Sequence, residues 1–121
     1  MKLVISIAGD SLQSPFDARF GRAAAFCLVD SDTGSWTAHA NPALEAAGGA
    51  GVQAAQCVAG LGAQAVVSGA YGPKAYASLS AAGIAMHLAP GNAPRTGADV
   101  LAQFKAGELS QAQAATQDGR H

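Results

Sequence analysis

Small residues dominate this 121-residue chain: 30 residues are alanine and 15 are glycine. Only 25 residues are Val, Ile, Leu, Phe or Met, so few large side chains are available to build a core. Protein interiors are close-packed, so elements with such small side chains must approach one another closely. A chain of this length folds as one domain and buries about two-thirds of its extended surface, which suffices for a core without disulfides or metals. The sequence therefore predicts one thin, closely packed domain.

The charge balance argues against a partner that is a polyanion. Seven basic residues face eight acidic ones, for a net charge of −1, whereas nucleic-acid binders show a clear basic surplus. The apolar run at the N-terminus is too short for a signal peptide, and no segment reaches the length of a membrane span. We therefore expect a cytoplasmic protein with neither a nucleic-acid nor a membrane partner. Two cysteines, Cys27 and Cys57, cannot define a disulfide framework and are expected to be small buried hydrophobes.

Apolar runs and helical spacings predict the element order βββαβαβα. The expected strands are residues 2–8, 24–30, 36–40, 65–68 and 84–88. The expected helices are residues 51–61, residues 73–83 and a last helix that Thr96 caps. We expect residues 1–106 to form the domain. Residues 107–121 lack an apolar stripe and are expected to be a flexible C-terminal tail.

Short connections between helices and strands predict the topology. Right-handed crossovers place the first, fourth and fifth strands parallel, with the hairpin of the second and third strands beside the first. The result is an α/β fold of the ribonuclease H-like type, with a five-stranded mixed sheet of order 3-2-1-4-5 and helices on its faces. Segments 9–22, 41–51, 69–73 and 89–97 then emerge at one end of the sheet. Open α/β sheets bind ligands beyond the carboxyl ends of their strands, so this end is the expected site.

The first of these segments carries Arg19, Phe20, Gly21 and Arg22. Arginine is a forked cation suited to anions, and glycine allows close approach of the backbone. An alternative is that Asp17 pairs with Arg19 and fixes the loop, while Phe16 and Phe20 fill the core. The two interpretations can coexist.

Two glycine-rich segments, 48–51 and 69–74, each lead into a helix. Free backbone N–H groups at a helix start attract anions, and Lys74 adds a cation near the second start. Neither segment has the spacing of a nucleotide-binding fingerprint. His39 and His87 lie near the same end of the sheet and are candidate metal ligands, although isolated histidines are more often structural.

An enzymatic function finds little support in the sequence. Asp10 ends the first strand, but strand 65–68 and helix 51–61 supply no further carboxylates for a two-metal nuclease. No nucleophile elbow is present either. We therefore expect a protein that is not an enzyme. An enzyme of unknown chemistry is kept as a third interpretation, beside a cluster carrier and an anion-binding or partner-binding module.

Several motifs together resemble a known family. They are DARFGRA at 17–23, NP at 41–42, GAGVQAA at 49–55, AVVSG at 65–69, GPKA at 72–75 and AGI at 82–84. In this order they are similar to the dinitrogenase iron–molybdenum cofactor-binding family, the nitrogenase accessory-factor-like domains, over residues 2–104. The resemblance implies a ribonuclease H-like core that binds a preformed metal–sulfur cluster and carries or stores it. The chain is most similar to small stand-alone members, among which the orange proteins hold a molybdenum–copper sulfide cluster.

For this chain, the resemblance implies non-covalent binding of a molybdenum-containing cluster, either a molybdenum–copper sulfide or the iron–molybdenum type, and an unidentified protein that donates or accepts it. Cys27 in mid-strand and Cys57 in mid-helix are badly placed as ligands, so charge, hydrogen bonds and apolar contacts must hold the cluster. The candidate cofactor-binding residues are Arg19, Phe20, Gly21, Arg22, His39, Asn41, Gly49, Gly51, Gly69, Tyr71, Gly72 and Lys74. The alternative is a small-anion or phosphate sensor, or a partner-binding module, without metal. Visible absorption separates the two, because only the cluster is coloured.

Overall fold

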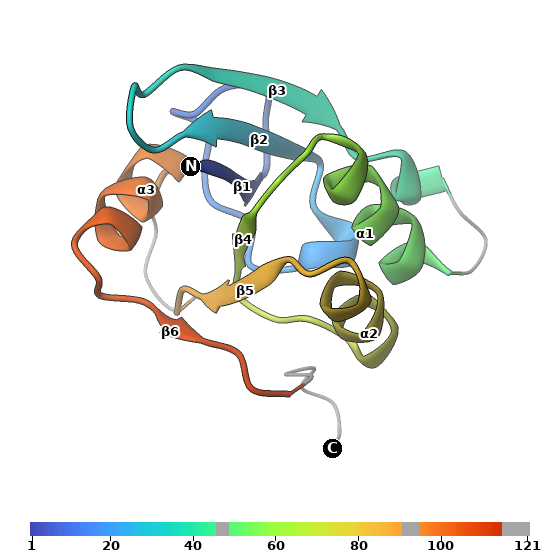
Figure 1. Cartoon of the computed structure of the whole chain (residues 1–121). Helices are drawn as coiled ribbons and strands as arrows, with labels where there is room; N and C mark the ends of the chain where they lie inside the picture. Colours follow the sequence, from blue (N-terminus) through green and yellow to red (C-terminus); the bar gives the residue numbers. More distant parts are fainter. Residues whose placement is uncertain (46–48, 91–94, 115–121) are drawn as a thin grey trace.

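The chain folds into a mixed six-stranded sheet with helices on both faces (Figure 1). The computed structural model describes residues 1–45, 49–90 and 95–114. The strands are β1 (Lys2–Ile7), β2 (Ala25–Asp30), β3 (Trp36–Ala40), β4 (Ala65–Ser68), β5 (Ala85–Leu88) and β6 (Ser110–Gln111). The helices are α1 (Ala50–Gly60), α2 (Pro73–Ala81) and α3 (Gly97–Lys105), with short 3₁₀ segments η1 (Phe20–Arg22) and η2 (Pro42–Glu45). None of these helices is long and apolar enough to cross a membrane, within the part of the chain that is described.

The sheet order is β3-β2-β1-β4-β5-β6, which confirms the predicted order of the first five strands. β1, β4 and β5 are parallel, and β2 and β3 form the antiparallel hairpin beside β1. The prediction of five strands was wrong, because β6 pairs antiparallel with the outer edge of β5. Ser110 and Gln111 are both exposed, so this strand forms through backbone pairing with β5 and has no apolar pattern by which the sequence could predict it. Ala112, which follows, is buried and donates its N–H to the carbonyl of Met86 at 2.8 Å.

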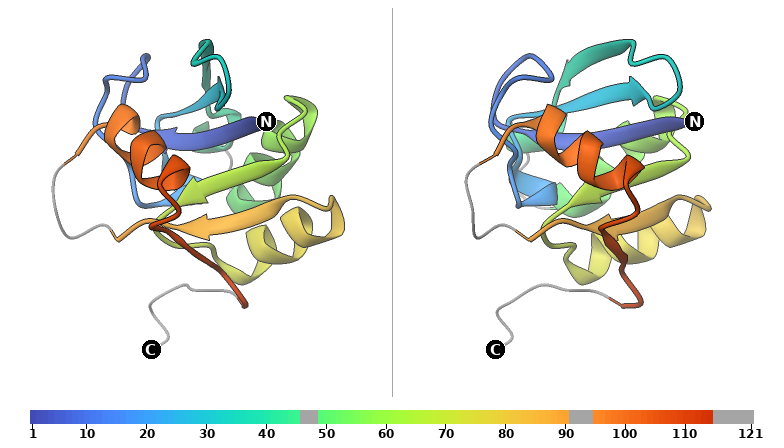
Figure 2. Two further views of the ribbon diagram at one scale, coloured as in Figure 1. Left: turned by 60° about the vertical axis from the view of Figure 1, so that its left-hand side comes forward. Right: turned by 90° about the vertical axis from the view of Figure 1, so that its left-hand side faces the viewer.

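α1 and α2 lie on one face of the sheet and α3 lies on the other (Figures 1 and 2). Alternate residues of β1 serve the two faces: Val4 packs with α1 and α2, while Leu3 and Ile5 pack on the side of α3. A strand covered on both faces is mainly apolar, which explains the apolar residues of β1. Its one buried polar residue, Ser6, is hydrogen-bonded to Asp17 and Ser68. α3 begins as predicted, since Thr96 and Asp99 form a reciprocal capping box at its start.

Small side chains set the spacing between α1 and α2. A Cβ added to Gly51 would lie only 3.2 Å from the backbone N of Ala75 and 3.3 Å from its Cβ. Ala54 and Ala75 are buried in the core cluster beneath the two helices. The abundance of small residues thus allows the first turns of these helices to lie against each other.

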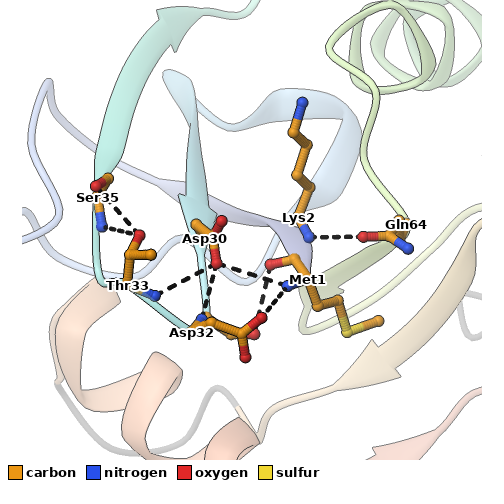
Figure 3. Close-up of polar contacts among 8 residues, drawn as sticks. Met1, Lys2, Asp30, Asp32, Thr33, Ser35 and Gln64 are labelled. Atoms are coloured by element: carbon orange, nitrogen blue, oxygen red, sulfur yellow. Dashed lines mark hydrogen bonds and ion pairs between the residues drawn. The ribbon is translucent and has the colours of Figure 1, made fainter.

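Polar contacts close the turn of the β2–β3 hairpin, at the end of the sheet where β1 begins (Figure 3). Asp30 Oδ1 accepts hydrogen bonds from the backbone N–H of Asp32 at 2.8 Å and of Thr33 at 3.4 Å. These backbone bonds, with that of Asp32 the strongest, lower the pKa of Asp30. The amine of Met1 contacts Asp32 at 2.9 Å. The carboxylates of Asp30 and Asp32 therefore hold the turn and the N-terminus together.

Candidate functional site

A pocket of about 670 Å³ lies where η1 meets the first turns of α1 and α2. We call it the η1–α1–α2 pocket. Its lining residues are Arg19, Phe20, Gly21, Arg22, Ala50, Gly51, Ala70, Gly72, Pro73, Lys74 and Ala75. Seven of the predicted site residues, drawn from three separate segments, therefore meet in one place. It lies at the predicted end of the sheet, because β4 runs toward it and α2 begins after the loop that follows β4.

The helix starts at this pocket are not capped by side chains. Gly49 and Gly72 occupy the N-cap positions of α1 and α2, and neither first turn contains an acidic residue. The backbone N–H groups of Gly51, Lys74 and Ala75 have no acceptor among the described residues. α3 contrasts with them, because Thr96 and Asp99 cap its start. Two helix N-termini thus bring partial positive charge to one pocket, together with N–H groups that have no partner in the described part of the chain.

The cations at the pocket differ in their partners. Arg19 forms a two-point ion pair with the buried Asp17, with Nε–Oδ1 and Nη2–Oδ2 distances of 3.2 Å, and this contact raises the pKa of Arg19. Arg22 and Lys74 are exposed and have no ion pair within the described ranges. Among the described residues that line the pocket there is no Asp or Glu. The local pairing of Asp17 with Arg19 is confirmed, whereas the Arg22 guanidinium has no ion-pair partner among the described residues.

Phe20 and Phe16 differ in their burial. Phe20 is buried, and its ring centroid lies 5.3 Å from that of Phe26 and 5.5 Å from that of Tyr71. Phe16 is only half-buried, and the Arg95 guanidinium lies 5.3 Å from its ring centroid. Phe20 therefore fills the core, as that interpretation predicted, whereas Phe16 is only partly buried against it. Phe20 also lines the pocket.

The loop after β4 and the loop before η1 are joined along their backbones. The N–H of Gly69 donates to the carbonyl of Ala18 at 3.0 Å, and the N–H of Phe20 donates to that of Ala70 at 3.4 Å. A Cβ on Gly69 would lie 2.5 Å from the Cβ of Ala18. Gly69 therefore permits the close approach of two loops, and it does not itself line the pocket.

Asn41 is placed behind the pocket. Its buried side-chain amide donates to the carbonyls of Ala23 at 2.9 Å and Gly21 at 3.3 Å, and its Oδ1 accepts from the N–H of Ala43 at 2.9 Å. Asn41 thus fixes η1 and the chain that follows it. It positions η1, which lines the pocket, and does not line the pocket itself.

Tyr71 is also a structural residue. Its ring is fully buried. Its hydroxyl oxygen lies 2.8 Å from the carbonyl oxygen of His87 and 3.1 Å from that of Val66, and both carbonyls are hydrogen-bond acceptors for it. Burial raises the pKa of this hydroxyl well above its usual range. The hydroxyl therefore bonds to backbone carbonyls of β4 and β5. Tyr71 does not line the pocket, where it was expected to donate to a ligand.

The structure does not bring the two candidate histidines together. His39 lines a second pocket of about 400 Å³ with Gly9 and Asp10, and its Nε2 lies 2.8 Å from Thr37 Oγ1. His87 lies on the α3 side, where its ring meets that of Phe104 edge-on at 5.0 Å and burial lowers its pKa. No group of three metal-ligating side chains occurs in the described ranges.

The cysteines lie away from the pocket. Cys27 is fully buried on the α3 side of the sheet, and burial raises the pKa of its thiol to about 11. Cys57 is half-buried toward the far end of α1, and burial raises its pKa as well. Neither lines the η1–α1–α2 pocket, so this pocket has no thiolate to offer.

Sequence reasoning missed the small apolar part of the lining, which comprises Ala50, Ala70, Pro73 and Ala75. These residues lie between or beside the predicted glycines, so their position in or next to the two glycine-rich segments could have identified them as lining residues. The exposed Gly49, by contrast, takes a left-handed conformation with φ +73° before α1 and is not among the lining residues. The pocket is therefore cationic and amide-rich, with apolar methyl groups between the donors.

Comparisons with known proteins identify similar chains. A family model described as dinitrogenase iron–molybdenum cofactor matches residues 1–107. The structure of the apo form of the orange protein from Desulfovibrio gigas has 32% identity and a TM-score of 0.90, over 96% of each chain. The NMR structure of a putative NifB protein from Thermotoga has 24% identity and a TM-score of 0.82, over 98% of each chain, and shows the same fold. No curated protein matches the chain.

Proposed function

Because this chain belongs to the dinitrogenase iron–molybdenum cofactor family, we propose that it binds a preformed metal–sulfur cluster in the η1–α1–α2 pocket. The cluster is cargo that the protein carries or stores, and the protein is not an enzyme. We expect a molybdenum-containing cluster, either a molybdenum–copper sulfide or the iron–molybdenum type. A second protein, not yet identified, donates or accepts it.

One observation carries the proposal: two uncapped helix starts meet Arg22 in one pocket, and among the described residues Arg22 has no ion pair and no carboxylate lines the pocket. A sulfide-rich cluster is a polyanion, and backbone N–H groups and arginine stabilise it through charge-assisted hydrogen bonds. Alanine methyl groups and Phe20 suit the apolar surface of its sulfides. Since Cys27 and Cys57 lie elsewhere, binding is non-covalent and without thiolate ligation.

A second candidate is supported by the same donors. Amide groups and a free arginine also suit phosphate or another small oxyanion, which needs no metal-ligating side chains. In that case the protein is an anion sensor or a partner-binding module. The two candidates differ in whether molybdenum and sulfide stay bound after small molecules are removed.

The test is anaerobic loading of the apo-protein with tetrathiomolybdate and copper, followed by desalting and measurement of bound molybdenum, copper, sulfide and visible absorption. We expect coloured protein with molybdenum in stoichiometric amounts. Arg22→Ala is expected to weaken binding by about tenfold or more, because one charged hydrogen bond contributes about 1.5–3 kcal/mol.

Lys105→Ala is the matched control, because it removes an exposed cation at the end of α3, on the other face of the sheet. Equal binding by the two variants would place the site elsewhere. Parent protein that stays colourless but binds phosphate would favour the anion sensor.

A further inference from the structure

The two edges of the sheet differ in how they are protected from other strands. β6 forms one edge with only two residues, and so short an edge offers little backbone for pairing. β3 forms the other edge with five residues, and its sequence WTAHA contains no Asp, Glu, Lys, Arg or Pro. It pairs with β2 in continuous register, without a bulge. β3 is the uppermost element in Figure 1, and no described strand pairs with its outer edge. It therefore lacks the devices that usually prevent pairing between chains.

The backbone of β3 presents alternate residues to its two edges. At one end of the β2–β3 ladder, the N–H of Asn41 donates to the carbonyl of Ala24 at 3.1 Å. At the other end, the N–H of Asp30 donates to the carbonyl of Ser35 at 2.9 Å. Every second residue of an antiparallel strand bonds to its neighbour, so the odd-numbered residues of β3 bond to β2. The even-numbered residues direct their N–H and C=O groups to the outer edge, and these are Trp36, Ala38 and Ala40.

One face of β3 carries both a large side chain and a hollow. Trp36 is 42% exposed. Ala38 and Ala40 lie on the same face as Trp36, because successive side chains of a strand alternate between faces. These two alanines line the second pocket, of about 400 Å³, and its other lining residues are Gly9, Asp10, Ala24, Ala25 and His39. A tryptophan and a hollow of small residues therefore lie on one strand, on the same side of the sheet.

We infer that β3 pairs antiparallel with β3 of a second copy of this chain, about a two-fold axis at Ala38. Ala38 then lies opposite Ala38 of the second copy, and Trp36 of each copy lies opposite Ala40 of the other. The outward-facing N–H and C=O groups of both strands pair with one another in this register. The inference goes beyond the proposed function and does not depend on the ligand of the η1–α1–α2 pocket.

A second copy suits this edge better than an unrelated strand, because β3 carries both halves of the contact. A two-fold interface brings the same surface of each copy together, so the tryptophan of one copy meets the hollow of the other. Aromatic side chains in pockets dominate the binding energy of many interfaces, and the carboxylate of Asp10 in the hollow is an acceptor suited to the indole N–H. The net charge of −1 opposes association only weakly.

The first experiment is sedimentation velocity of the full apo-protein. Concentrations run from about 5 μM to about 1 mM, because a five-residue edge makes a small interface. We expect monomer to convert reversibly to dimer as the concentration rises. Trp36 is the only tryptophan, so its fluorescence emission should shift to the blue as the dimer buries its ring.

Two variants test the interface. Ala38→Lys places two ammonium groups opposite each other at the axis, and Trp36→Thr removes the aromatic ring but keeps a residue that favours strands. We expect each to raise the dissociation constant of the dimer about tenfold or more. Ala59→Lys is the matched control, since it adds the same charge at an exposed position of α1 and should dimerise like the parent. Circular dichroism and thermal melts establish that each variant is folded.

Disulfide cross-linking tests the register. Opposed Cα atoms of a hydrogen-bonded pair lie about 5.5 Å apart, which a disulfide spans, so Ala38→Cys should cross-link two copies on mild oxidation. Ala40→Cys is the control, because its two copies would lie about 13 Å apart along the strands. Both are made with Cys27→Ala and Cys57→Ala, since Cys27 lies opposite Ala38 in the β2–β3 ladder and would compete for the new thiol.

Three results overturn the inference. The first is a parent protein that stays monomeric at every concentration, which would leave the edge to a strand of another protein. The second is a dimer that forms equally well in Ala38→Lys and in Trp36→Thr. The third is cross-linking at position 40 that is as fast as at position 38. If Ala38→Lys does not fold, Trp36→Thr and the cross-linking pair decide by the same criteria.

Discussion

Arg19 and Arg22 are close in sequence, yet the structure gives them different roles. Arg19 is 71% exposed but holds both carboxylate oxygens of Asp17, which is only 8% exposed. Asp17 also accepts the backbone N–H of Arg19 at 3.0 Å. Arg22 has no such acidic neighbour among the described residues. One arginine therefore shapes the loop, and the other is available to a ligand.

Arg19→Ala is expected to lower the free energy of unfolding by about 1 kcal/mol, because an exposed arginine is screened by solvent even when its partner is buried. Cluster binding should weaken only through the altered loop. Urea unfolding and cluster titration of the same sample measure both effects. The assignment of roles is reversed if Arg19→Ala loses affinity at unchanged stability while Arg22→Ala binds like the parent.

The cysteines allow a test of ligation without thiolates. Replacement of both Cys27 and Cys57 by alanine should leave the visible bands of the loaded protein intact, because neither side chain lines the pocket. In the parent, a thiol reagent should modify Cys57 before Cys27, since Cys27 is fully buried with a pKa of about 11. Loss of colour in a folded double variant would contradict non-covalent binding.

The loops that carry the site are positioned by contacts between elements. The segment before η1 is held against the loop after β4 by the Gly69–Ala18 backbone hydrogen bond, and Asn41 ties η1 to the start of η2. Ser6 of β1 reinforces this join, because its hydroxyl donates to the carbonyl of Asp17 at 2.6 Å. The pocket therefore depends on three separate segments keeping their relative positions.

Gly69→Ala tests this dependence. The added Cβ would lie 2.5 Å from the Cβ of Ala18 and 2.9 Å from its Cα and carbonyl oxygen, so the loops must separate. We expect a loss of about 1–3 kcal/mol in the free energy of unfolding, together with weaker cluster binding. Gly60→Ala, which meets nothing, should be neutral or slightly stabilising. Equal midpoints of urea unfolding for the two variants would show that close approach at Gly69 is unimportant.

The two faces of the sheet differ in what they carry. The pocket lies at the starts of α1 and α2, whereas the α3 side is a core without a lining residue of the pocket. Cys27 and His87 both belong to that second side. Neither of them lines the pocket.

His87 should give the protein a pH-dependent stability. Burial lowers its pKa below the ordinary value of 6.5, so the unfolded chain takes up a proton more readily than the folded one. Stability that is present above about pH 6.5 should therefore be lost as the pH falls toward the lowered pKa. Urea midpoints between about pH 5 and pH 8 should fall more steeply at the acid end for the parent than for His87→Gln. Parallel curves for the two proteins would contradict this assignment.

The sequence by itself determined the positions of the five longer strands and of the three helices. The buried positions of β1 are apolar except for Ser6, because both faces of the strand are covered. Thr96 with Asp99 marks the start of α3 by local chemistry. The two glycine-rich helix starts and the Asp17–Arg19 pair were also readable, since each arises between residues near in sequence. β6 could not be predicted from the sequence, because it forms through backbone pairing with β5 and its two side chains are exposed.

Only the tertiary structure decided which candidate side chains share the pocket. His87 pairs with Val67 across β4 and β5 and therefore faces α3, while Tyr71 turns its hydroxyl into the sheet. Asn41 is drawn behind η1, because its buried amide must satisfy its hydrogen bonds with backbone groups. The residue types and their order along the chain are local properties. The face and depth of each side chain depend on strand register and on which neighbours bury it, and these are settled only when distant segments pack together.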